Sequence, residues 1–268
     1  MDSIHFFYFF DNMSLLNEKI KGISLVELLL LFILLFISIG GLKFLNVSFN
    51  FNYVYLVIII YFILKFRNSF FEFKQDLFEI FSQFSFKSIF SIVLLNIFFS
   101  YGMLYLSNYL VQIVNLNGNY FGLFFPSMSL NSEIFGIMGL LSVVLISPIV
   151  EELVFRGIFL NKLRMIVPTT FAILISSLLF ASLHSFGSIF SAFIFAICMA
   201  ILYLKSENIL VPIFGHFLNN LIGESLYHLD SSQILFKNDL VVAGMSILAI
   251  ISFILILKFI FSNWNNFK

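Results

Sequence analysis

Long apolar runs separated by short polar stretches cover most of the chain, and they predict an all-α protein. A helix needs ~20 apolar residues to cross the hydrocarbon core of a bilayer. The runs that approach this length lie near residues 23–42, 52–66, 88–114, 134–155, 169–186, 188–204, 208–225 and 240–260. Residues 67–87 instead have an amphipathic pattern with several phenylalanines, typical of a helix that lies in the membrane interface. The pattern therefore predicts a polytopic transmembrane bundle of about eight helices.

The composition places this bundle in a lipid bilayer. Hydrophobic residues make up 61% of the 268 residues, charged residues make up 10%, and the mean hydropathy is +1.07. These values are typical of an integral membrane protein. The formal net charge is zero and no basic run occurs, which excludes a nucleic-acid partner. We expect a single integral membrane domain over residues 1–268, because neither an internal repeat nor a linker interrupts the pattern.

The positions of the basic residues predict the orientation of the chain in the cell membrane. With eight crossings and a cytoplasmic N-terminus, every Lys and Arg except Lys43 and Lys237 falls on the cytoplasmic side. An excess of basic residues inside is the usual bias of membrane proteins. We therefore expect a multi-pass cell-membrane protein with both termini in the cytoplasm.

The candidate chemistry begins with two adjacent acids, Glu151 and Glu152, inside the fourth apolar run. Ionisable groups within a membrane are costly, so they favour a functional interpretation. On a helix, Glu152 and Arg156 share a face at a spacing of four residues, and we expect them to form an ion pair. Glu151 is turned ~100° away. It is therefore the freer carboxylate and the candidate general base.

Further polar candidates follow in the next apolar runs. His184 ends the segment Phe-Ala-Ser-Leu-His, and His216 and Asn220 lie one helical turn apart in His-Phe-Leu-Asn-Asn. His216 with Asn220 forms a candidate oxyanion hole, because imidazole and amide groups are suitable donors to a carbonyl oxygen under attack. His184 is the candidate for orienting the attacking water. The concentration of these groups between residues 151 and 220 favours a catalytic site over isolated buried polar residues.

These motifs together resemble the CAAX protease and bacteriocin-processing family, the type II prenyl-endopeptidase group of intramembrane proteases. The resemblance rests on Glu-Glu-x-x-x-Arg at 151–156, Phe-x-x-x-His at 180–184 and His-x-x-x-Asn at 216–220, and it covers a core at about residues 130–225. It implies a cavity that faces the cytoplasm, and a first glutamate that activates water beside the histidine of the second motif. It also implies a substrate that is a peptide or a membrane protein, with or without an attached lipid. The roles it implies are CAAX-type processing, bacteriocin-related processing or self-immunity.

Two alternatives remain open at this point. The same residues are able to form a zinc-dependent intramembrane metalloprotease, although no cofactor is expected from the hydrogen-bonding pattern. A non-enzymatic transport or immunity protein is the alternative of a different class. The predicted spans also place Glu151 ~25 Å below the outer membrane edge and His184 near that edge. The two residues meet only if the intervening helix is short, tilted or begins deeper.

Overall fold

The computed structural model describes residues 15–45, 52–82, 86–113, 137–185, 187–230 and 237–267. The regular secondary structure in these ranges is entirely helical, which confirms the all-α prediction. The elements are α1 (Leu15–Lys21), α2 (Leu25–Phe44), α3 (Asn52–Phe66), α4 (Phe70–Ser82), α5 (Phe86–Ile113), α7 (Ile137–Leu141), η2 (Ser142–Ile146), α8 (Ser147–Glu152), η3 (Leu153–Leu160), α9 (Asn161–Leu163), α10 (Thr169–Ala181), α11 (Ile189–Ser206), α12 (Leu210–Leu229), α14 (Asp239–Trp264) and η4 (Asn265–Phe267).

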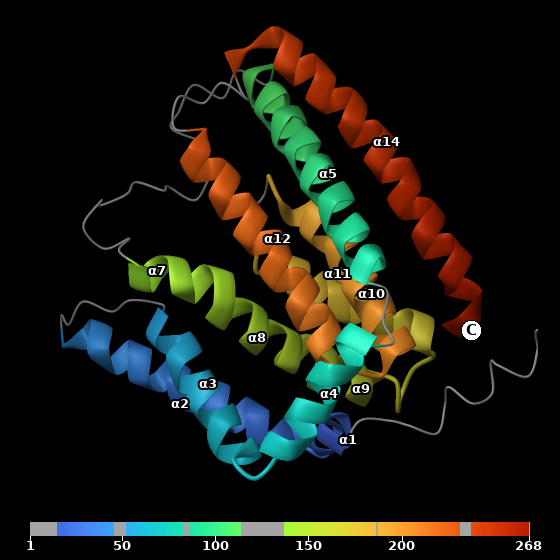
Figure 1. Cartoon of the computed structure of the whole chain (residues 1–268). Helices are drawn as coiled ribbons and strands as arrows, with labels where there is room; N and C mark the ends of the chain where they lie inside the picture. The colour runs from blue at the N-terminus through green and yellow to red at the C-terminus, as the bar shows by residue number, and fades with distance from the viewer. Residues whose placement is uncertain are drawn as a thin grey trace, which may run out of the picture.

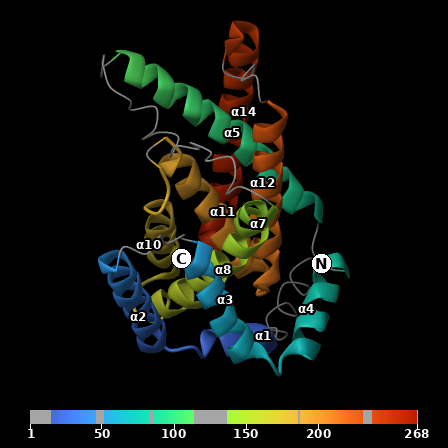
Figure 2. The same ribbon diagram turned by 90° about the vertical axis from the view of Figure 1, so that its left-hand side faces the viewer.

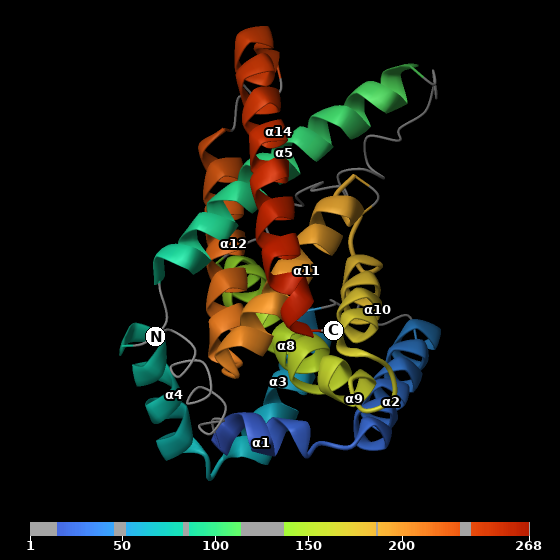
Figure 3. The ribbon, with the colours of Figure 1, turned by 90° about the vertical axis from the view of Figure 1, so that its right-hand side faces the viewer.

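The helices form a bundle around α11, with the N-terminal helices gathered at one end. Helix α11 packs against α5, α10, α12 and α14, and the long helices α5 and α14 pack against each other. Figure 1 shows α1 to α4 at one end of the molecule, and the last turns of α5 and the first turns of α14 at the opposite end. Figure 3 shows that α5 crosses α14 near the middle of both helices, where Phe99 stacks on Phe253, and that α12 lies beside them.

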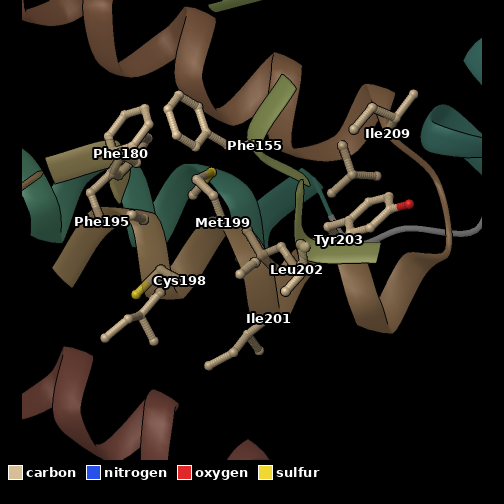
Figure 4. Close-up of a cluster of buried hydrophobic side chains, with 14 of the residues drawn as sticks. Phe155, Phe180, Phe195, Cys198, Met199, Ile201, Leu202, Tyr203 and Ile209 are labelled. Carbon is tan, nitrogen blue, oxygen red and sulfur yellow. The ribbon is translucent and has the colours of Figure 1, made fainter. Parts of the chain in front are cut away.

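The core around α11 is closely packed and apolar. Met199, Ile201 and Tyr203 of this helix are each no more than 1% exposed, and Figure 4 shows them among side chains from neighbouring elements, including Phe155 and Phe180. Cys198 is buried and forms no disulfide. A core of this density fixes the positions of the flanking helices, so polar side chains that project from them are held in place.

The run predicted near residues 134–155 is one continuous helical stretch whose hydrogen bonding changes along its length. It passes through α7, the π-helical segment η2, α8, the second π-helical segment η3 and α9. Pro148, the second residue after η2, has no N–H to donate, so the regular i→i−4 pattern is interrupted there. Both glutamates lie at the end of the short α8 segment between the π-helical segments. Such π segments are often found at functional sites.

Several predicted spans are shorter in the structure than a simple crossing requires. Among the described residues, Phe86–Ser107, Ile189–Ser206 and Asp239–Phe267 are long and apolar enough to cross a membrane. A fourth is added if Val54–Phe66 and Phe71–Phe78, bent by 103°, count as one broken span. Helix α10 has only 13 residues, ~20 Å of rise. The membrane bundle is confirmed, whereas eight full crossings stay a prediction.

The predicted interfacial segment forms α4, which is tied to α1 by polar contacts. Lys19 Nζ donates to Glu72 Oε1 at 2.7 Å and to Ser69 Oγ at 2.9 Å. The hydrogen bond from Lys19 lowers the pKa of the Glu72 carboxyl. Phe71 and Phe78 of the same helix are about 70% exposed (69% and 74%). Helix α4 therefore presents large apolar side chains outward, as expected for an interfacial helix.

Candidate functional site

Glu152, Arg156 and His216 form a fully buried hydrogen-bonded unit. Arg156 Nη1 donates to Glu152 Oε1 at 3.0 Å, so the structure contains the i,i+4 ion pair. His216 Nδ1 lies 2.8 Å from the same oxygen. An ionised carboxylate only accepts hydrogen bonds, so Nδ1 carries the proton and donates it to Glu152. The side chains of Glu152 and Arg156 are 0% and 1% exposed. The glutamate therefore neutralises the arginine and fixes the orientation of the imidazole.

Neighbouring helices complete the environment of this unit. Arg156 Nη2 donates to the carbonyl oxygen of Ala196 on α11 at 3.1 Å, and its guanidinium lies 4.6 Å from the ring centre of Phe180 on α10. The rings of Phe180 and Phe195 contact the His216 imidazole edge to face. Such apolar walls strengthen the electrostatic interactions they enclose. The central position of α8 between α3, α10, α11 and α12 is visible in Figure 2.

Glu151 is held differently, by two neutral hydroxyl groups. Tyr55 Oη, from α3, donates to Glu151 Oε1 at 2.9 Å, and Ser147 Oγ donates to the same oxygen. Glu151 keeps 13% of its side-chain surface exposed, whereas Glu152 keeps none. Glu151 is therefore the more accessible carboxylate. Among the described residues, its hydrogen-bond donors are neutral hydroxyl groups, whereas Glu152 accepts from the cationic Arg156.

The second oxygen of Glu151 faces the histidine that Glu152 orients. Glu151 Oε2 lies 3.9 Å from His216 Nε2. Because Nδ1 donates to Glu152, neutral His216 has its lone pair on Nε2, directed toward this gap. Protonation of Nε2 would turn it into a donor next to two carboxylates. The geometry thus presents a carboxylate oxygen and an imidazole nitrogen to the same small space.

His184 lies in the turn after α10 and joins the same site. Its Nδ1 lies 3.1 Å from the carbonyl oxygen of Phe180, so Nδ1 donates to that carbonyl and Nε2 is left with its lone pair. The ring centres of His184 and Phe180 are 4.7 Å apart, and Phe180 also contacts the His216 imidazole at 5.7 Å. The conflict over depth is resolved because α10 is short and ends at Ala181. Helix α10 thus ends before the predicted span boundary near residue 186, which agrees with grouping His184 with the other motifs.

Asn220 lies one turn beyond His216 on α12, but its amide contacts a backbone group. Asn220 Nδ2 donates to the carbonyl oxygen of Val143, within η2, at 3.0 Å. Asn96 Nδ2 donates to Asn219 Oδ1 at 2.9 Å, and Asn219 in turn contacts Asn220 Oδ1 at 3.4 Å. Three amides thus connect α5 and α12 to the π-helical segment. In this arrangement Asn220 supports the helix that carries the glutamates, and one of its two amide hydrogens remains unassigned.

Sequence reasoning missed the two hydroxyl donors to Glu151. Ser147 is four residues before Glu151, so the i,i+4 rule contained the signal for it. Tyr55 had no such signal, because it is an isolated tyrosine in an apolar run almost a hundred residues earlier. Only the contact between α3 and α8 brings it to the site.

Two further features concern what the site is able to hold. Among the described residues, no three His, Cys, Asp or Glu side chains are grouped so as to hold a metal ion. An apolar cavity of about 640 Å³ adjoins the helices that carry the glutamates and His216. Ile149 and Leu153 on one side and Ile213 and Phe217 on the other contribute to its walls. This size is within the usual range of ligand pockets.

The fold and the site define a helical membrane protein with a buried Arg–Glu–His unit beside a second, more accessible glutamate. Residues 133–222 match the family model described as Rce1-like, type II CAAX prenyl endopeptidase Rce1-like. The match includes all three motifs and agrees with the resemblance seen in the sequence. It does not include α3, which provides Tyr55. No curated protein and no solved structure matches the chain.

Proposed function

We propose that this protein is an intramembrane endopeptidase that hydrolyses a peptide bond with water activated by Glu151. The observation that carries the proposal is the unequal setting of the two glutamates. Glu152 is bound to Arg156 and His216, while Glu151 has one oxygen held by hydroxyl groups and the other facing His216 Nε2 at 3.9 Å. The similarity of residues 133–222 to a protease family supports the same conclusion.

In the proposed reaction, Glu151 Oε2 takes a proton from water as the water oxygen attacks the peptide carbonyl carbon. The protonated carboxyl then gives this proton to the leaving amine, so the products are a carboxylic acid and an amine. General-base assistance of this kind contributes about 10²–10⁴-fold to a rate. His184 Nε2 accepts a hydrogen bond from the water and orients it.

The negative charge that develops on the carbonyl oxygen requires a donor. In this proposal the doubly protonated imidazole of His216 supplies it from Nε2, while Nδ1 donates to Glu152 and keeps the ring oriented. Asn220 supplies its second amide hydrogen to the same oxygen, while its first supports Val143. Glu152 and Arg156 act through His216 and do not touch the substrate.

The substrate in this proposal is a peptide or membrane-protein segment with an apolar portion. The 640 Å³ cavity next to α8 and α12 is suited to hold an apolar side chain or a lipid attached to the peptide. The basic residues near the ends of the spans favour a cavity that opens to the cytoplasm, in a cell-membrane protein with both termini inside.

The test compares purified wild-type protein with Glu151→Gln in lipid nanodiscs. The substrates are a farnesylated peptide that ends in Cys-aliphatic-aliphatic-X, its unlipidated counterpart and a library of apolar peptides, with products detected by mass spectrometry. We expect Glu151→Gln to reduce cleavage by about 10²–10⁴-fold while the protein keeps its melting temperature. Glu224→Gln is the matched control, because Glu224 is a partly buried glutamate on α12 that pairs with His228.

Three other outcomes would contradict the proposed function or its mechanism. Equal cleavage by wild-type protein and Glu151→Gln would exclude Glu151 as the base. Cleavage that is lost on chelation and restored by stoichiometric zinc would establish the metalloprotease alternative. Wild-type protein that cleaves none of the peptides, while cells that carry Glu151→Gln and wild-type cells have the same peptide content, would favour a transport or immunity role.

A further inference from the structure

A second cavity, lined by basic residues, lies at the C-terminal end of the helical stretch from α7 to α9 that carries the glutamates. Its volume is about 320 Å³, at the small end of the range for ligand pockets. It is formed where the end of α1 meets α9 and the start of α10. Its lining residues are Lys21, Asn161, Lys162, Arg164, Met165 and Thr169. We refer to it as the basic pocket.

The charges of the basic pocket favour an anion. Lys21 Nζ pairs with Glu207 Oε2 at 2.9 Å. Lys162 Nζ donates to the backbone carbonyl of Lys21 at 2.7 Å, which fixes its ammonium group at the pocket. Neither Lys162 nor Arg164 forms an ion pair with any residue that the structure describes. Within the described residues, Glu207 is paired with Lys21, while Lys162 and Arg164 lack an acidic partner, so this part of the pocket is positively charged.

The surroundings of the pocket place this charge beside an apolar surface. Met165 and Ile166 follow Arg164 directly, and each is 77% exposed. Backbone hydrogen bonds hold the turn, from Met165 N to Lys162 O and from Ile166 N to Leu163 O. Exposed apolar side chains next to cationic ones are typical of a surface that contacts the boundary between headgroups and acyl chains.

We propose that the basic pocket binds the phosphate of an anionic lipid headgroup, while Met165 and Ile166 contact its acyl chains. Lys162 and Arg164 supply the charge, and Thr169, the first residue of α10, also lines the pocket. Basic pockets between membrane helices bind lipid headgroups in this way. The site differs from the Glu151 site and does not rest on the proposed peptidase activity.

The experiment measures retained lipid by native mass spectrometry, with full-length protein in nanodiscs of phosphatidylcholine containing phosphatidylglycerol. Arg164→Gln removes an exposed guanidinium, and Lys162→Gln removes the ammonium beside it. The control is Lys258→Gln, which removes an exposed charge on α14. We expect each pocket variant to lower phosphatidylglycerol affinity about fivefold, and the control to leave it unchanged.

Two further arms identify the source of the anion. Met165→Ser with Ile166→Ser is expected to weaken phosphatidylglycerol binding as well, whereas inorganic phosphate at the same concentration is expected to leave bound lipid in place. Displacement of the lipid by inorganic phosphate would mean that the pocket is a free-phosphate site. Unchanged lipid affinity in both Arg164→Gln and Lys162→Gln would overturn the proposal, and so would an equal loss in Lys258→Gln.

Discussion

Replacement of Glu152 by glutamine is expected to destabilise the protein much more than the same change at Glu151. Glutamine keeps the size of the side chain and its acceptor oxygen but removes the charge. Arg156 would then remain 1% exposed without its counter-ion, with only the neutral carbonyl oxygens of the glutamine and of Ala196 and the ring of Phe180 around it. Removing one partner of a buried ion pair costs about 3–5 kcal/mol. At Glu151 the glutamine oxygen is still able to accept from the two hydroxyl donors, so the change in stability is expected to remain below about 1 kcal/mol.

A double replacement separates the charge effect from a general loss of packing. Glu152→Leu with Arg156→Met replaces both charges with apolar groups, and removing both partners of a buried pair is often neutral. We therefore expect the double variant to recover most of the stability lost in Glu152→Gln. The double variant is also expected to be inactive, because His216 Nδ1 loses the acceptor that fixes the orientation of the imidazole.

The measurement is equilibrium unfolding of the purified variants in one detergent, analysed as a double-mutant cycle between positions 152 and 156. The expected coupling energy is at least about 2 kcal/mol in favour of the pair. A Glu152→Gln protein as stable as wild type, or a double variant less stable than both single variants, would show that Glu152 does not neutralise Arg156 in the folded protein.

The remaining predictions concern the hydroxyl donors, the metal question and the topology. Tyr55→Phe and Ser147→Ala are each expected to lower kcat about tenfold with little change in KM. Loss of one hydrogen bond to a carboxylate costs about 1.5–3 kcal/mol and lets the base rotate. A larger effect on KM than on kcat would contradict this positioning role. Prolonged treatment with a membrane-permeant chelator, checked by elemental analysis, is expected to leave most of the activity. In a Cys198→Ser background, cysteines at Leu163 and Lys205 are expected to react with an impermeant thiol reagent only in inside-out vesicles, and labelling from the outer face would reverse the predicted orientation.

The amino-acid sequence determined the class of the protein and most of the candidate site. Membrane helices can be recognised from the sequence alone, because they satisfy their own backbone hydrogen bonds and need only a sufficiently long run of apolar side chains. The Glu152–Arg156 pair was also predictable from the sequence, since a spacing of four residues places two side chains on one face of a helix. The order of the motifs also grouped His184 and His216 with the glutamates, although the predicted helix boundaries opposed this for His184.

The tertiary structure decided how these groups meet. Only the packing of α12 against α8 shows that His216 binds Glu152 and faces Glu151, and only the packing of α3 brings Tyr55 to Glu151. Tyr55 and Glu151 are 96 residues apart, and no local periodicity relates side chains at that separation. The shortness of α10 and the π-helical segments around α8 were likewise not predicted from the apolar runs. The sequence therefore determined which groups are present and that Glu151 is the freer carboxylate, and the packing of helices distant in sequence determined which groups it meets.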